Sequence, residues 1–312
     1  MALVVSILEM TLPVLVMLLL GLLCKQKKLF AQEGLAGIKS IVGNITLPVV
    51  LFNAFFTADY TAKTALSFTA VFTSCGIALA LGFALRRFVK PYGKFMPLLM
   101  TGFEGGMLGY ALFGLLYGAA QLKVFAMVDV GQTMFAYTVF LSTLKVISGQ
   151  KPSVKGVLRN MFTNPACVGM MLGIVLGLTG VGKAISGMAV GRMLAAITSF
   201  VAAPTAGLIL IIVGYELSLS RKLMKPVLCT VMLRLMVMMV LMSLSALLIF
   251  SFVPFEKELM VALLLAFSLP APFIIPLYAD VSGHGEYISA TLSVSTILTI
   301  VLFVGIAAYS IG

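Results

Sequence analysis

Long apolar runs alternate with short polar segments from one end of this chain to the other. A helix of roughly 20 apolar residues can cross the hydrocarbon core of a bilayer, which is about 30 Å thick. The runs therefore predict an all-α integral membrane protein with ten transmembrane helices. We expect these spans at residues 2–23, 34–57, 65–86, 95–118, 124–146, 163–181, 192–216, 226–252, 258–280 and 286–311.

The connections between the expected spans are short, except for the polar stretch from Ser148 to Asn164. This stretch predicts a cytoplasmic linker at 149–163, between a first five-helix repeat at 1–148 and a second at 164–312. Because five is an odd number, the two halves must cross the membrane in opposite directions. Opposite topology is the precondition for two inverted repeats, an architecture found in many secondary transporters.

Composition leaves almost no residues for a soluble domain. Hydrophobic residues make up 61% of the chain and charged residues only 10%, whereas soluble domains carry about a quarter charged residues. So few charges cannot build a water-facing surface. The excess of apolar side chains must therefore face membrane lipid.

The distribution of basic residues predicts the orientation. The positive-inside rule places the more basic set of loops in the cytoplasm, so we expect both termini outside, in a cell membrane (inner or plasma). It also explains the net charge of +11 without a nucleic-acid partner. The less basic side carries Lys63, Lys123, Lys183, Arg192 and Lys257, and the cytoplasmic side carries Lys25, Lys27, Lys28, Arg86, Arg87, Lys90, Lys94, Lys151, Lys155, Arg159, Arg221, Lys222 and Lys225.

Motifs for enzymatic chemistry are missing from the sequence. The four cysteines have no metal or redox spacing, and the single His284 supports neither a His-based metal site nor a His-dependent triad. The glycine-rich stretches lack the Lys-Ser/Thr pair of a nucleotide-binding loop. We therefore expect that the protein is not an enzyme and that it binds no metal or cofactor, apart from Na⁺ or H⁺ as a coupling ion.

Two spans in matching positions of the halves carry helix breakers. Glycines interrupt the fourth span, and prolines interrupt the ninth, which continues to Pro276. Freed backbone groups cannot face lipid, so we expect the two breaks to cross and satisfy one another around a binding site. Half-helix N-termini there would suit a carboxylate. The predicted substrate-binding residues are Gly102, Glu104, Gly105, Gly106, Gly109, Pro270, Ala271 and Pro272. The alternative is a pair of kinked helices packed through small residues.

Ionisable residues deep in a span are functional candidates by default. Glu104 lies at the break, where burial favours its neutral form and would suit proton coupling; the alternative is a structural carboxyl that caps backbone N–H groups. Asp129, Gln132 and Thr133 share one face of the fifth span, and Ser289, Ser293 and Thr296 form a polar stripe on the tenth, which packing also explains. The predicted ion-coupling residues are Glu104, Asp129, Gln132 and Ser293.

Arg234 lies about two turns inside the eighth span. It either snorkels to the interface or needs an anionic partner, for which Glu104, Asp129 and the substrate are the candidates, so it joins the predicted substrate site. Asn44 in the second span contacts substrate in one interpretation and a neighbouring helix in the other. Lys39 is expected to reach the lipid headgroups.

These residues carry a resemblance. Glu104 to Gly109-Tyr110-Ala111, Leu269-Pro270-Ala271 to Ala279-Asp280, Glu286 to Ser289, Ser295-Thr296, Leu47-Pro48 and Pro204 resemble the auxin efflux carrier family. That family includes bacterial malate and malonate permeases and has a bile-acid/sodium symporter-like fold. The resemblance covers essentially the whole chain.

The resemblance implies crossing helices 4 and 9, a scaffold of spans 1, 2, 6 and 7 that forms a homodimer, and a transport core of spans 3–5 and 8–10. It also implies an elevator-like movement that carries small organic anions. Two positions depart from the family pattern: its Asn is Glu104 here, and its following Pro is Ala111. A carboxylate at the crossing disfavours an anionic substrate unless the carboxylate is protonated or paired.

The sequence therefore favours a secondary active transporter of a small organic anion, a mono- or dicarboxylate such as malate, malonate or an auxin-like acid, by symport with H⁺ or Na⁺. The alternative is a cation/proton exchanger that uses Glu104 and Asp129.

Overall fold

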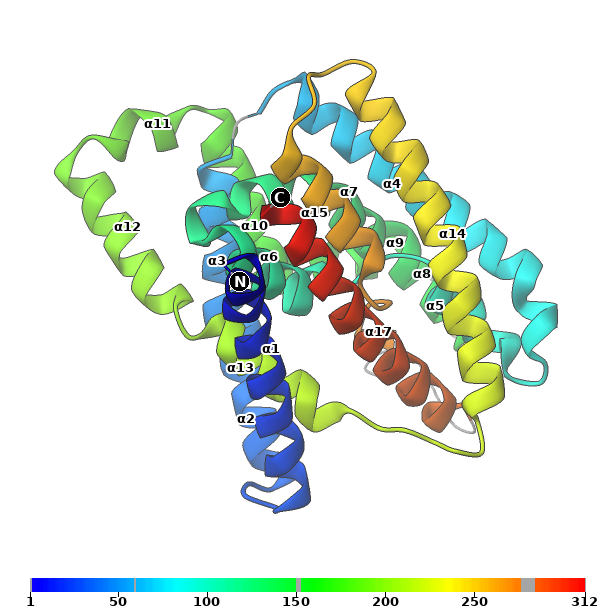
Figure 1. Cartoon of the computed structure of the whole chain (residues 1–312). Coiled ribbons are helices and arrows are strands. Elements are labelled where there is room, and N and C mark those ends of the chain that lie inside the picture. Colours follow the sequence, from blue (N-terminus) through cyan, green and yellow to red (C-terminus); the bar gives the residue numbers. More distant parts are fainter. Residues whose placement is uncertain (1, 59, 150–152, 276–283, 312) are drawn as a thin grey trace. The chain divides into compact units, whose positions relative to one another are not determined.

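The computed structural model describes residues 2–58, 60–149, 153–275 and 284–311. All regular structure in these residues is helical (Figure 1). The first half contains α1 (Ala2–Gln26), α2 (Gln32–Ile41), η1 (Val42–Thr46), α3 (Leu47–Phe56), α4 (Ala62–Leu85), η2 (Arg86–Val89), η3 (Tyr92–Phe95), α5 (Met96–Met100), η4 (Gly105–Gly109), α6 (Tyr110–Tyr117), η5 (Ala119–Gln121), α7 (Leu122–Phe135), η6 (Ala136–Phe140) and α8 (Leu141–Ile147).

The second half follows the same scheme of long apolar helices and short connections. It contains α9 (Val154–Thr163), α10 (Pro165–Leu178), α11 (Val181–Ser186), α12 (Ala189–Ala202), α13 (Thr205–Glu216), α14 (Met224–Phe250), α15 (Lys257–Ser268) and α17 (Gly285–Ile311). Helix α9 lies in the predicted linker, where the sequence analysis expected only a connection.

In the described residues, 7 helical segments are long and apolar enough to cross a membrane, or 8 if one bent pair counts as a span. This confirms an all-α membrane fold. The bent pair is Tyr92–Met100 with Gly105–Tyr117, which meet at 54° in the expected fourth span. The sixth expected span is the shorter helix Pro165–Leu178, and the ninth runs into residues that lie outside the described ones. Ten spans in inverted repeats therefore stay a prediction.

Proline explains one local departure from regular α-helix. The second expected span is continuous from α2 to α3 but contains the π-helical turn η1 immediately before Leu47-Pro48. Pro48 has no N–H to donate to the carbonyl four residues earlier. The helix therefore widens at this point instead of ending.

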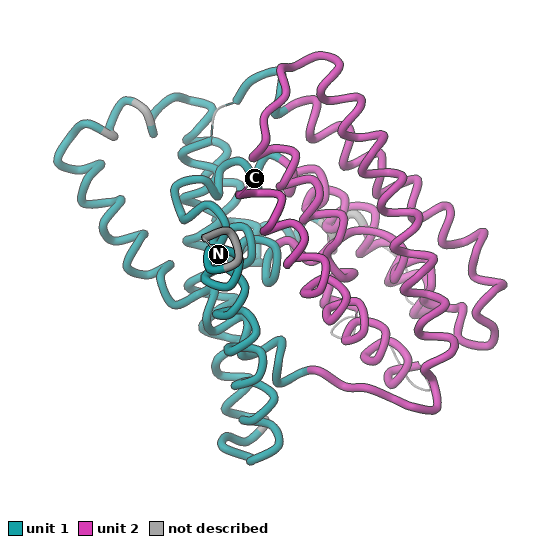
Figure 2. Tube along the Cα trace, viewed as in Figure 1, with its two compact units in different colours: residues 1–64, 106–127, 158–216 teal, residues 65–105, 128–157, 217–312 magenta. Residues whose placement is uncertain are grey.

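The helices form two compact units that interleave along the chain (Figure 2). Unit 1 consists of residues 1–64, 106–127 and 158–216. Unit 2 consists of residues 65–105, 128–157 and 217–312. Neither unit is one of the two consecutive repeats predicted at 1–148 and 164–312, because each unit contains spans from both halves of the chain.

Unit 1 is built on two close helix pairs, α1 with α13 and α3 with α10. Gly169, Gly173 and Gly177 of α10 lie against successive turns of α3, at Pro48, Phe52 and Phe55. Because the residue numbers of α10 and of α3 increase together along the contact, the two helices run in the same direction. Small residues let the two backbones approach closely, as is common in membrane helices.

A tyrosine closes the same pair beyond the end of α3. The hydroxyl of Tyr60 donates to the carbonyl of Phe55 at 2.8 Å, and its ring lies against Gly177 of α10. Burial raises the pKa of Tyr60 to about 12, because the phenolate would lose its hydration.

Unit 2 is organised around α14, which packs against α5, α15 and α17. The hydroxyls of Ser74 in α4 and Ser245 in α14 lie 3.0 Å apart. Tyr287 at the start of α17 bonds the hydroxyl of Thr230 in α14 at 2.5 Å and stacks on Tyr92. These contacts fix the helices that carry the polar centre of the unit.

The close approach of α3 and α10 yields a first prediction. A Cβ on Gly173 would lie 2.6 Å from the carbonyl oxygen of Phe52 and 2.9 Å from Cβ of Phe55. We expect Gly173→Ala to lower the free energy of unfolding by about 1–3 kcal/mol through overpacking, measured by denaturant or thermal unfolding in detergent.

The matched control is Gly37→Ala in α2, where a Cβ meets no atom within 4 Å. This change removes a helix-interior glycine without a clash, so it should stabilise the protein by up to about 1 kcal/mol. Equal effects of the two substitutions would contradict the packing described for unit 1.

Candidate functional site

Unit 2 brings together the broken segments of the fourth and ninth expected spans. The helix of the fourth span ends at Met100, and the chain is extended at Thr101 (φ −116°, ψ 162°). Helix α15 ends at Ser268, and Leu269 is extended as well (φ −64°, ψ 154°). The N–H of Glu104 donates to the carbonyl of Pro270 at 2.9 Å. The two breaks therefore cross, and each supplies a backbone partner to the other.

Glycine is required at position 102 for two reasons. Gly102 has φ +64°, a backbone conformation that glycine adopts without steric cost. A Cβ at this position would also lie 3.1 Å from Cγ of Pro272. The sequence therefore matches a glycine on one segment with a proline on the other, where the two segments are in contact.

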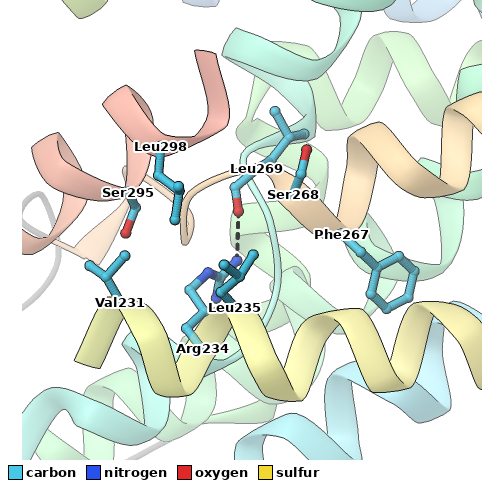
Figure 3. A pocket seen from close by; sticks show the side chains of 8 residues that line it. All are labelled: Val231, Arg234, Leu235, Phe267, Ser268, Leu269, Ser295 and Leu298. Carbon is cyan, nitrogen blue, oxygen red and sulfur yellow. Dashed lines mark hydrogen bonds between the residues drawn. The ribbon is translucent and has the colours of Figure 1, made fainter. Parts of the chain in front are cut away.

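A buried arginine holds the crossing together. Arg234 extends from α14 and is only 4% exposed. Its guanidinium donates to the carbonyls of Leu99 (3.0 Å), Thr101 (3.5 Å), Gly102 (2.6 Å) and Leu269 (3.0 Å); Figure 3 shows the bond to Leu269. These carbonyls lie at the C-terminal ends of α5 and α15, where a positive charge is favourable.

This geometry corrects the expectation for Arg234. The sequence analysis assigned it a carboxylate partner or a path to the interface. It is too buried to snorkel, and its four acceptors among the described residues are backbone carbonyl oxygens. Two broken helices leave carbonyls without helical donors, and the planar fork of arginine is suited to bonding several of them at once.

Glu104 contacts the opposite segment with its side chain. Its Oε2 accepts a hydrogen bond from the backbone N–H of Phe273 at 2.6 Å. The contact joins the two breaks a second time, in addition to the backbone bond to Pro270. This is the capping contact that the sequence analysis held as the alternative to proton coupling for Glu104.

Asp129 and Gln132 of α7 lie next to the same segment. The hydroxyl of Thr133 donates to Oδ2 of Asp129 at 3.1 Å, which agrees with the expected position of both residues on one helix face. The other carboxylate oxygen lies against Gly105, with no room for a Cβ there. The amide nitrogen of Gln132 donates to the carbonyl of Phe103. The amide oxygen of Gln132 accepts no hydrogen bond from any described residue.

The predicted site residues thus divide into two groups. Unit 2 gathers one group at the crossing: Gly102, Glu104, Gly105, Pro270, Ala271, Pro272, Arg234, Asp129 and Gln132. Gly106 and Gly109 lie in η4 and are grouped with unit 1, as is Asn44, whose side chain donates to Ser40 Oγ at 3.0 Å. Pro276, Ala279 and Asp280 lie outside the described residues.

Two further polar residues have structural partners. Ser293 accepts the backbone N–H of Ser218 at 2.9 Å, and Thr296 bonds the carbonyl of Leu292 in its own helix at 2.9 Å. In unit 1, Lys39 forms an ion pair with Glu216, a partner that the expectation of a headgroup contact did not include.

Several residues of the crossing could not be identified from the sequence. Thr101 donates its hydroxyl to the carbonyl of Cys75 in α4 at 2.5 Å, and Phe273 and Leu269 contribute backbone groups. The signal available in the sequence was the buried position of Arg234, which demanded acceptors somewhere. Nothing in a sequence marks which carbonyls those are.

A narrow pocket opens beside Arg234 (Figure 3). It has space for about one water molecule, so an organic acid could enter only if the pocket widened. Its walls come from α14, α15 and α17 and the segment after α15: Val231, Arg234, Leu235, Phe267, Ser268, Leu269, Ser295 and Leu298.

A second prediction concerns the arginine. Lysine carries the same charge but only three donors on one nitrogen, so Arg234→Lys leaves buried carbonyls unsatisfied. We expect the free energy of unfolding to fall by about 3 kcal/mol, measured by thermal unfolding. The matched control is Arg221→Lys in the exposed loop before α14, which should stay within about 0.5 kcal/mol of the parent. An unchanged Arg234→Lys protein would contradict the role assigned to the fork.

A third prediction concerns Gly105. Gly105→Ala should displace the Asp129 carboxylate and lower the free energy of unfolding by about 1–3 kcal/mol. Removing the obstacle with Asp129→Ala should relieve this cost, so the double variant should lose less than the sum of the single effects. Additive losses in the double-mutant cycle would show that the two residues do not touch.

None of the curated proteins matches the chain. The sequence model of the family described as membrane transport protein matches residues 6–306, almost the whole chain. The chain therefore belongs to the membrane transport protein family, that of the auxin efflux carriers, and is an integral membrane transporter.

Proposed function

We propose that this protein is a secondary active transporter of a small organic anion, a mono- or dicarboxylate, coupled to H⁺ or Na⁺. One observation carries the proposal: two interrupted helices cross in unit 2, with the ionisable side chains of Arg234, Glu104 and Asp129 at the breaks. Transporters bind solutes at paired helix breaks at membrane depth. Non-helical backbone at that depth cannot face lipid and therefore lies within the protein or lines a cavity.

Helix pairing in unit 1 supports two inverted repeats. Exchanging the halves turns the first span into the sixth and the second into the seventh. The pair α1 with α13 (first and seventh) then becomes α10 with α3 (sixth and second), and these are the two close pairs of unit 1. The shared direction of α3 and α10 agrees with an even number of membrane crossings from one to the other.

The division into units supports elevator-type alternating access. Unit 1 contains the expected scaffold spans 1, 2, 6 and 7, and unit 2 contains spans 3, 8 and 10 with the crossing. Residues 106–127 are grouped with unit 1, although the resemblance assigns them to the transport core. In this proposal unit 2 carries the site across a cell membrane, both termini lie outside, and the scaffold forms a homodimer.

The charges at the crossing explain why the transport should be coupled. Arg234 is positive, whereas Glu104 and Asp129 are negative when ionised. An organic anion would add a further negative charge in a region of low dielectric, where an unbalanced charge is costly. A cotransported cation, H⁺ or Na⁺, offsets that cost.

Uptake into proteoliposomes tests this function. We expect the purified protein to accumulate at least one labelled acid from a panel of malate, malonate and indole-3-acetate, and a pH or Na⁺ gradient to increase the accumulation. Protein-free liposomes and the Arg234→Lys protein are the controls. If none of these acids enters under any gradient, the proposed substrate class is wrong.

A cation/proton exchanger is the second candidate, favoured by the oxygen atoms of Asp129, Glu104 and Gln132 around one segment. The same proteoliposomes distinguish a cation/proton exchanger from an organic-anion transporter. An exchanger would dissipate a pH gradient when Na⁺ or K⁺ is added without any organic anion, whereas an organic-anion symporter would not.

A further inference from the structure

We propose that Glu104 couples proton and substrate by competition: its ionised carboxylate occupies the backbone donor of Phe273 that a substrate carboxylate uses, so that the organic anion binds only after Glu104 is protonated. The inference rests on the proposed function and names the coupling ion as H⁺ and its carrier as Glu104. The observation behind it is the 2.6 Å hydrogen bond from the N–H of Phe273 to Oε2 of Glu104.

The contact is one that a solute carboxylate would make equally well. A carboxylate is an acceptor, and charge-assisted hydrogen bonds from backbone N–H groups are its strong interactions in a protein. Glu104 is itself a tethered carboxylate, held at the crossing by its own N–H bond to Pro270. It therefore acts at very high effective concentration against any free acid.

Protonation removes this competition. A proton taken up from water converts the Glu104 carboxylate to a neutral acid, with no other bond made or broken. The neutral acid accepts more weakly, and its O–H becomes a donor that can itself bond the incoming carboxylate. The same proton removes one of the negative charges that would repel the substrate.

Of the two carboxylates at the crossing, Glu104 is the one that accepts a backbone N–H from the opposite segment, whereas Asp129 accepts from a hydroxyl of its own helix. Arg234 is already bonded to four backbone carbonyls and Asp129 to the Thr133 hydroxyl. Ser268 of α15 and Ser295 of α17 bring hydroxyl groups to the pocket beside Arg234. Among the residues that the structure describes, the charged or titratable groups at the crossing include Arg234 of α14, Asp129 of α7 and Cys75 of α4.

The test measures binding rather than transport. The full-length protein in detergent is titrated with indole-3-acetate, a monocarboxylate that stays ionised between about pH 6 and about pH 8, and the dissociation constant is obtained calorimetrically. If one proton is taken up with each anion, the dissociation constant should rise about tenfold per pH unit where Glu104 is ionised. Malate and malonate serve as further probes.

Glu104→Gln keeps an acceptor oxygen for the N–H of Phe273 but cannot ionise. We expect this variant to bind the probe as tightly at high pH as the parent does at low pH, with no pH dependence. Glu33→Gln, which neutralises an exposed acid in α2 of unit 1, is the matched control and should keep the slope of the parent. Asp129→Asn removes the other carboxylate at the crossing and so distinguishes the two candidates for the proton carrier.

Each outcome decides one proposal. Absence of binding by the parent and by Glu104→Gln, for every probe and pH, would overturn the organic-anion function itself. Binding with a pH-independent constant, or a slope that survives Glu104→Gln and disappears in Asp129→Asn, would overturn the competition by Glu104 and leave the transporter proposal in place.

Discussion

The structure of unit 2 depends on satisfying backbone polar groups where two helices stop inside an apolar protein. A helix that ends leaves carbonyl oxygens at one end and N–H groups at the other, with partial charges of opposite sign. Arg234 supplies donors to the carbonyls at the ends of α5 and α15, and Glu104 supplies an acceptor to Phe273. The positive arginine therefore lies at the carbonyl ends, and the carboxyl of Glu104 lies at an N–H group.

Because these partners all belong to unit 2, the crossing is held from within one compact body. Removing water from this region strengthens each bond and raises the cost of leaving any one unmade. In the elevator-type movement proposed for this protein, the hydrogen bonds would therefore persist while unit 2 moves as a whole. A site held by bonds to a second body would have to break them in every transport cycle.

The sequence predicted the elements that depend on local chemistry. Apolar length predicted most helices to within a few residues, glycine and proline predicted the breaks, and spacing placed Asp129 and Thr133 on one helix face, where they form a hydrogen bond. It did not predict the acceptors of Arg234, because a backbone carbonyl has no residue identity. The pairing of Lys39 with Glu216, 177 residues apart, likewise depends on tertiary packing that no local pattern records.

The departure of this chain from the family pattern at position 104 then acquires a physical meaning. An asparagine, the residue of that pattern, has both a donor and an acceptor and stays neutral at every physiological pH. Glu104 can only accept when ionised, and it changes charge on protonation. The same backbone geometry with asparagine would bind an anion without a proton. In the competition proposed for Glu104, replacing the amide with a carboxyl keeps the capping contact and adds a dependence on protons, so that a single side-chain group would change the energy source of transport while leaving the fold unchanged.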